Sequence, residues 1–70
     1  MKSTKVDGTV VHIGDTIDFK SDIEQYGTLK QISRTPNGIA LVLTSTYGFH
    51  GDYIGGQRET EVLAKDCWVD

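Results

Sequence analysis

The feature that most constrains the fold is a pair of short alternating runs that lie close together in the sequence. The first run, residues 14–20, opens with a Gly-Asp turn and places two large apolar side chains on one face of a strand. The second run, residues 26–32, has its apolar residues at Leu29 and Ile32, a spacing that breaks strict alternation. We therefore expect a β-bulge near Lys30-Gln31. Together the runs predict the first two paired strands of a small, strongly bent sheet.

Shorter apolar runs, separated by turn residues, fill the rest of the chain. Asp7-Gly8 fits a type I′ turn, so residues 1–11 are predicted to form a short hairpin or a loosely attached arm. Residues 34–38 contain Pro-Asn-Gly and predict a second turn, whereas the polar stretch 21–25 predicts a loop. The remaining predicted elements are a strand over 39–45 that is covered at least in part on both faces, a strand over 58–63, one helical turn over 64–66, and a last strand over 67–69.

Length and composition describe one folded domain spanning residues 1–70. Hydrophobic residues make up 37% and charged residues 24% of the chain, whereas disordered chains combine low hydrophobicity with high net charge. The net charge of -3 disfavours a general binder of duplex nucleic acid or of an anionic membrane. Cys67 is the single cysteine, which excludes an intrachain disulfide, and no run has the pattern of a signal peptide or a membrane span. We therefore expect a cytoplasmic protein.

About five or six short strands in this order, with a one-turn element before the last, predict an all-β, small SH3-like barrel. An OB-like barrel is the alternative. The segments 12–19 and 26–32 resemble the start of KOW- and Tudor-type SH3-like domains, in which Gly-Asp opens the first strand and a later Gly precedes the second. Short motifs at 22–27, 48–53 and 66–68 also resemble small uncharacterised proteins of tailed bacteriophages. That resemblance implies a phage-encoded protein acting in the host bacterial cytosol, and it carries no established role.

The most distinctive predicted loop, residues 46–56, concentrates aromatic residues and glycines. Rings supply contact area at low entropic cost, and loops on a rigid barrel commonly carry binding sites. We expect a partner-binding surface here, whose residues are Tyr26, Tyr47, Phe49, His50, Asp52 and Tyr53. The alternative is that Phe49 and Tyr53 pack into the end of the barrel, because so small a domain needs large core residues.

Trp68 has two interpretations. Together with Tyr26 or a ring of the long loop, it would floor a groove for an extended or proline-rich peptide, or line an aromatic cage for a methylated lysine. The simpler interpretation is that Trp68 closes the bottom of the barrel.

No residue pattern indicates catalysis, a cofactor or a metal site. Cys67, His12 and His50 lack the close ligand pairs of a structural zinc site. The glycine-rich loop lacks the Lys-Ser/Thr pair and following helix of a phosphate-binding loop. We therefore expect no catalytic residues, no cofactor and no enzyme activity.

These observations predict a non-catalytic protein-interaction module, monomeric or weakly self-associating, that binds a host or phage protein. The first alternative is a KOW-like nucleic-acid-binding domain that uses Lys20, Lys30, Arg34 and Arg58. The second is a small structural or oligomeric protein, because the apolar run 39–43 needs cover on both faces.

Overall fold

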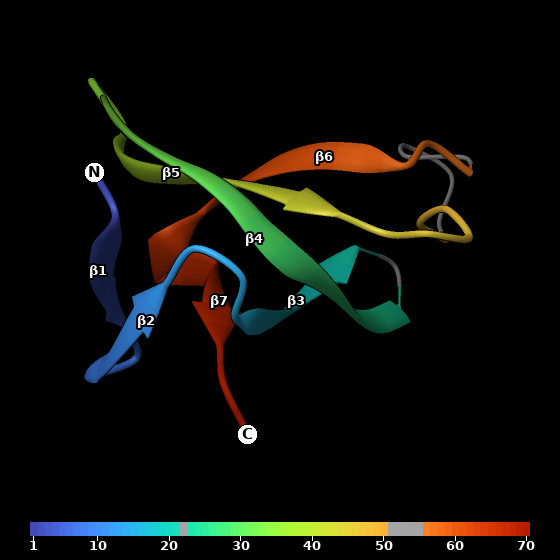
Figure 1. Cartoon of the computed structure of the whole chain (residues 1–70), viewed down its shortest axis with the longest axis horizontal. Coiled ribbons are helices and arrows are strands. Elements are labelled where there is room, and N and C mark those ends of the chain that lie inside the picture. Colours follow the sequence, from blue (N-terminus) through green and yellow to red (C-terminus); the bar gives the residue numbers. More distant parts are fainter. Residues whose placement is uncertain (22, 51–55) are drawn as a thin grey trace.

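A computed structural model of the chain describes residues 1–21, 23–50 and 56–70. Within these residues, seven strands form two antiparallel sheets (Figure 1). The first sheet is a hairpin of β1 (Ser3–Val6) and β2 (Thr9–His12). The second sheet has the order β6-β5-β4-β3-β7; its strands are β3 (Thr16–Ser21), β4 (Ile23–Thr35), β5 (Gly38–Thr44), β6 (Glu59–Leu63) and β7 (Cys67–Trp68). A 3-10 helix, η1 (Ala64–Asp66), connects β6 to β7.

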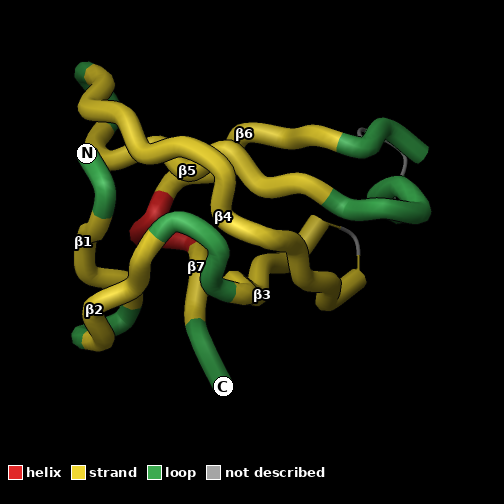
Figure 2. Tube along the Cα trace, in the orientation of Figure 1, coloured by secondary structure: helices red, strands yellow, loops and turns green. Residues whose placement is uncertain are grey.

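The predicted all-β architecture is confirmed, including the single helical turn before the last strand. That turn lets the chain cross from β6, at one edge of the sheet, to β7, at the other edge beside β3. The trace curls accordingly around its interior, as expected for a small barrel-like domain (Figure 2). In the part of the chain that the structure describes, no helix is long and apolar enough to cross a membrane.

The long strand β4 carries the predicted bulge. Its pairing with β5 shifts register between Leu29 and Gln31. The extra residue turns Ile32 back to the side on which Leu29 already lies, and both side chains are buried, at 1% and 4% exposure for Leu29 and Ile32 respectively. A bulge also bends the strand, which helps β4 wrap around the core (Figure 1).

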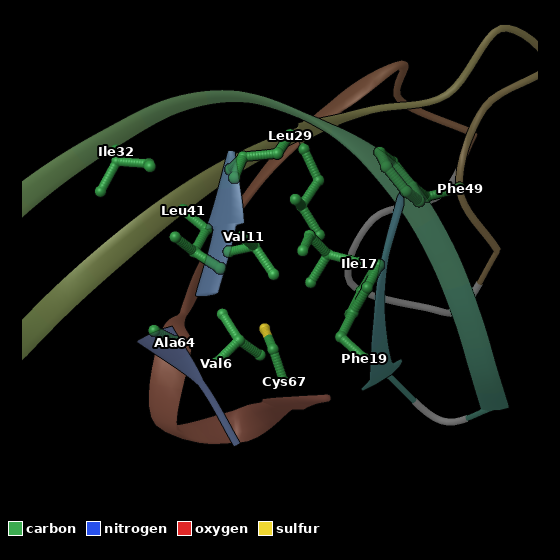
Figure 3. Close-up of a cluster of buried hydrophobic side chains, with 11 residues drawn as sticks. Val6, Val11, Ile17, Phe19, Leu29, Ile32, Leu41, Phe49, Ala64 and Cys67 are labelled. Carbon is green, nitrogen blue, oxygen red and sulfur yellow. The ribbon is translucent and has the colours of Figure 1, made fainter. Parts of the chain in front are cut away.

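The N-terminal hairpin is part of the domain. Asp7 and Gly8 have φ angles of 51° and 79°, as a type I′ turn requires. Val6 and Val11 are 0% and 2% exposed and join the core cluster (Figure 3). The alternative of a loosely attached arm is therefore wrong, because the hairpin supplies two of the few large apolar residues that this short chain has for its core.

Residues 21–25 were expected to form a loop, and the described ones among them belong to strands. The β3–β4 ladder pairs Lys20 with Glu24 and Ser21 with Ile23. None of its described residues is buried, so polar side chains remain solvated at this end of the hairpin. Polar composition was therefore a poor indicator of a loop at this position.

The strand predicted over 39–45 is confirmed as β5, between β4 and β6. Its neighbouring residues Ala40 and Leu41 face opposite sides and are both buried, at 1% and 0% exposure. The two faces are thus both covered in part, as the apolar run predicted.

Candidate functional site

Two aromatic residues of the long β5–β6 connection have opposite environments. Tyr47 is 97% exposed, whereas Phe49 is 2% exposed. The Phe49 ring meets Phe19 edge to face, with centroids 5.4 Å apart and an angle of 68° between the rings (Figure 3). The expectation that Phe49 contacts a partner is therefore wrong, because the small core takes its ring. The alternative, with Phe49 in the end of the barrel, holds.

Gly27 makes room for that ring. A Cβ atom built on Gly27 would lie 2.8 Å from Cζ of Phe49 and 3.0 Å from Cβ of Leu43. Real side chains do not approach so closely, so any larger residue must displace the Phe49 ring. The position of the Phe49 ring, on the long loop, thus requires a glycine at position 27 of β4.

The Gln25 side chain fixes the same loop segment to β4. Its Nε2 donates a hydrogen bond to the backbone oxygen of His50 at 2.8 Å, and its Oε1 accepts one from the His50 N–H at 2.8 Å. The Phe49 N–H also donates to the Gln57 oxygen at 2.8 Å, across the base of the loop. Residues 47–50 are consequently held beside β4. Sequence reasoning missed Gln25, because no local pattern signals a bond between residues 25 positions apart in the chain.

On the outer face, strand register aligns two rings and a carboxylate. Asp18 of β3 lies opposite Tyr26 of β4 on one side and opposite Trp68 of β7 on the other. Tyr26 is 68% exposed, and Trp68 is half-buried. A surface hollow, which we call the acidic hollow, is lined by Asp18, Glu24, Gln25, Tyr26, Trp68 and Asp70. The groove interpretation of Trp68 with Tyr26 therefore has a structural counterpart.

Two further hollows adjoin the first at Tyr26. One is lined by threonine and serine hydroxyls between Tyr26 and Tyr47, and the other extends from Glu24 past Tyr47 to His50. The larger of these two holds about 250 Å³ and is open, whereas small-molecule sites usually enclose about 300–1,000 Å³. We call the continuous surface the aromatic face; its residues are Asp18, Glu24, Tyr26, Tyr47, His50 and Trp68.

The residues predicted to form the partner-binding surface fall into three groups: exposed, buried, and outside the described part of the chain. Tyr26, Tyr47 and His50 are exposed and lie together. The Phe49 ring is buried in the core, and Phe49 also lines one of the hollows. Asp52 and Tyr53 lie outside the described residues.

Carboxylates crowd one another in the acidic hollow. The pKa of Asp18 is raised above its usual range, first by burial, then by repulsion from Asp70 and a hydrogen bond with Asp70, and last by repulsion from Glu24. Lys20 lies opposite Glu24 in the ladder, but among the described residues no Lys or Arg forms an ion pair with these three carboxylates. The hollow therefore gathers three carboxylates that form no ion pair with a described Lys or Arg side chain.

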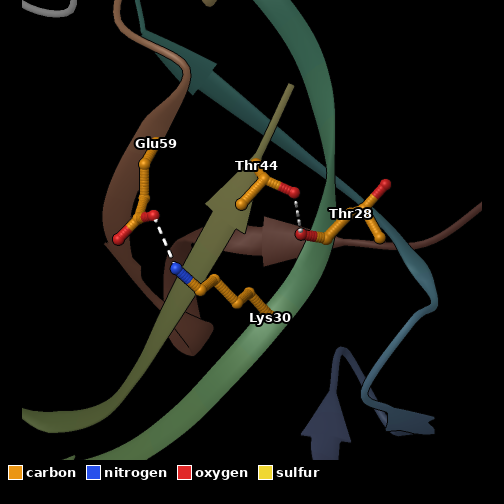
Figure 4. A network of polar contacts seen from close by, with 4 residues as sticks. All are labelled: Thr28, Lys30, Thr44 and Glu59. Atoms are coloured by element: carbon orange, nitrogen blue, oxygen red, sulfur yellow. Dashed lines mark hydrogen bonds and ion pairs between the residues drawn. The ribbon is translucent and has the colours of Figure 1, made fainter. Parts of the chain in front are cut away.

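The four basic residues of the nucleic-acid alternative are spread apart. Lys30 forms an ion pair with Glu59 at 2.9 Å (Figure 4). Arg34 lies opposite Ile39 at the start of β5, whereas Arg58 lies beyond Thr44 at the end of β5. Lys20 lies opposite Glu24 in the β3–β4 ladder. The strand register does not gather these four cations on one patch.

Cys67 has the environment of a structural thiol. It is buried, its Sγ lies 3.3 Å from the Leu63 oxygen, and burial with the nearby Asp66 charge raises its pKa to about 11. A raised pKa lowers the thiolate fraction that nucleophilic attack needs. Among the described residues, no group of three or more His, Cys, Asp and Glu side chains is placed to hold a metal ion.

Comparison of the chain with protein-family models, with curated proteins and with solved structures finds no match.

Proposed function

We propose that this chain is a non-catalytic protein-interaction module that binds its partner through the aromatic face. The observation that carries the proposal is the position of Tyr26, which lines all three adjoining hollows while remaining 68% exposed. Exposed tyrosine and tryptophan rings are the residue types that most often dominate binding energy at protein interfaces. A single exposed ring is common on a soluble protein, whereas three rings around adjoining hollows form the kind of patch that marks an interaction site.

The segment that carries Tyr47 is anchored to the sheet beneath the face. The Phe49 ring is locked against Phe19, and Gln25 clamps the backbone of His50, so the exposed Tyr47 is carried by an anchored segment. Preorganised contacts lose less entropy on binding than mobile ones. The resemblance to small phage proteins makes a host or phage protein the expected partner.

The charge distribution supports a protein partner over nucleic acid. The chain carries a net charge of -3, the acidic hollow forms part of the face, and Lys30 is already paired with Glu59. Binding to phosphates requires clustered cations that release counterions. A face that contains Asp18 and Glu24 would repel a phosphate backbone.

The test is a tagged pull-down from bacterial lysate, with and without nuclease, using the parent chain and a Tyr26→Ala/Tyr47→Ala double variant. We expect one protein to be retained in near-stoichiometric amount after nuclease treatment and to be lost with the double variant. Val10→Ala is the matched control, because Val10 is 52% exposed but lies on the N-terminal hairpin. Thermal unfolding monitored by circular dichroism verifies that all three chains fold.

Capture that disappears with nuclease would instead favour the nucleic-acid alternative. Capture that survives in the double variant would place the binding surface elsewhere on the domain.

A further inference from the structure

The acidic hollow has a composition that specifies the chemistry of its ligand. We infer that it binds an arginine or lysine side chain from an extended basic segment of the partner protein. This inference rests on the proposed function, because it names the chemistry that the aromatic face recognises.

The hollow is aligned across three strands. Tyr26, Asp18 and Trp68 occupy directly paired positions on β4, β3 and β7, and the neighbouring Ile17 and Phe19 face the core. Side chains at paired positions on one face lie about 5 Å apart at Cβ. A carboxylate is thus set between two aromatic side chains on a firmly packed sheet.

The charge of the hollow is complementary to a cation. Asp18, Glu24 and Asp70 line the hollow, and no ion pair among the described residues involves them. Residues 22 and 51–55 contain no Lys or Arg, so the chain holds no further cation in those positions. Crowding of the carboxylates raises the pKa of Asp18, after the larger effect of its burial. A bound cation would relieve the repulsion that Asp70 and Glu24 exert on Asp18.

The hollow combines aromatic rings with carboxylates. A cation is attracted to the face of a tyrosine or tryptophan ring, and a guanidinium can also donate hydrogen bonds to a carboxylate. An anionic ligand would be repelled, and a purely apolar one would leave the carboxylates desolvated. Because the hollow is open and continues past Tyr26 toward Tyr47, the cation is best delivered by a segment that lies along the face.

The experiment uses Trp68 as its reporter, since it is the only tryptophan of the chain. A short glycine-serine peptide with two arginines is titrated into the full chain, in parallel with a peptide that has glutamine in place of each arginine. We expect a saturable change in Trp68 fluorescence with the arginine peptide only. Raising the salt concentration from about 0.05 M to 0.5 M should weaken it, because the Debye length falls from roughly 14 Å to 4 Å.

Four variants locate the site. Tyr26→Ala and Asp18→Asn should each raise the dissociation constant by about fivefold, through loss of a ring contact and of a charged acceptor. Lys20→Gln should lower it by about twofold, because Lys20 is an internal cation opposite Glu24. Glu61→Gln is the matched control, since Glu61 is exposed on β6 and lines none of the three hollows; its constant should not change.

Equal responses to the two peptides, an unchanged constant for Asp18→Asn, or no saturation at millimolar arginine peptide would each overturn the inference. If the pull-down partner still depends on Tyr26 and Tyr47 in that case, the proposed function stands and only the cationic ligand is wrong. If the aromatic variants also leave capture unchanged, the proposed function fails as well.

Discussion

The two faces of the β3–β4 hairpin have opposite properties although their residues alternate along the same strands. On the inner face, Ile17, Phe19 and Leu29 are no more than 1% exposed. On the outer face, Asp18 is half-buried and Tyr26 is 68% exposed beside a hollow. Alternate residues of one strand thus differ in role. Inner residues stabilise the fold, and outer residues form the exposed surface to which we assign partner binding.

The largest expected effect is on the inner side, at Phe49. Phe49→Ala should lower the free energy of unfolding by about 3–5 kcal/mol, because it empties a closely packed ring site. So small a domain has only about 3–5 kcal/mol to lose, so much of the protein should unfold. Urea unfolding followed by circular dichroism measures the loss. Tyr47→Ala, two residues away and fully outside, should change stability by no more than about 0.5 kcal/mol; equal losses would break the comparison.

The next effect is at Gly27, where the two regions meet. Gly27→Ala should cost about 1–3 kcal/mol, since its Cβ would lie 2.8 Å from the Phe49 ring. The ring that must move is that of Phe49, so Phe49→Leu should relieve part of the stability cost of Gly27→Ala. The Gly27→Ala/Phe49→Leu double variant should therefore be more stable than the sum of the two single losses predicts. Strict additivity of the two losses would show that the strain at Gly27 lies elsewhere.

A smaller effect is expected at Gln25, which ties the loop to β4. Gln25→Ala removes two hydrogen bonds to His50 and should cost about 1–2 kcal/mol, because each bond contributes about 0.5–1.5 kcal/mol. Amide hydrogen exchange at His50 should accelerate. Gln31→Ala is the control on the same strand, since that side chain donates a hydrogen bond to Ser33 at 3.4 Å and forms none with His50. Unchanged exchange at His50 would mean that Phe49 alone anchors the loop.

The smallest effect is the pH dependence that Asp18 adds to folding. Because the folded pKa of Asp18 is raised, the native state holds this proton more tightly than the unfolded chain. The contribution of Asp18 to the free energy of unfolding is therefore fully present below the ordinary aspartate pKa and is lost as the pH rises through the raised pKa of the folded state. The loss persists at neutral pH. Asp18→Asn should be more stable than the parent at pH 7, and the difference should vanish at low pH. Thermal unfolding across pH checks both signs, and a parent that is the more stable chain at pH 7 would contradict the prediction.

Much of the fold could be predicted because its signals are local. The Asp7-Gly8 turn, the bulge after Leu29 and the turn before Cys67 each follow from a few neighbouring residues. The stretch 21–25 was missed because outward-facing strand residues and loop residues are both polar. Only the register of the β3–β4 ladder distinguishes them.

The candidate site was predicted only in part. Tyr26 and Tyr47 stand out as exposed rings, in keeping with the prediction, but nothing local separates Tyr47 from Phe49. The choice between them depends on the space that Gly27 leaves beside Phe19, in strands distant from the loop. Gln25 and Asp18 were not predicted as parts of the site, since their roles arise from partners on other strands.

Local residue patterns are sufficient to predict the all-β class, the order of the strands along the chain and most of the turns, because alternation and turn chemistry act over a few residues. Which ring fills the core, and which carboxylates share the hollow with Tyr26 and Trp68, depends on how the strands pack together. Those outcomes depend on pairing between residues as far apart as Asp18 and Trp68. These residues are paired only in the folded sheet. That sheet closes around a small core, which includes the Phe49 ring.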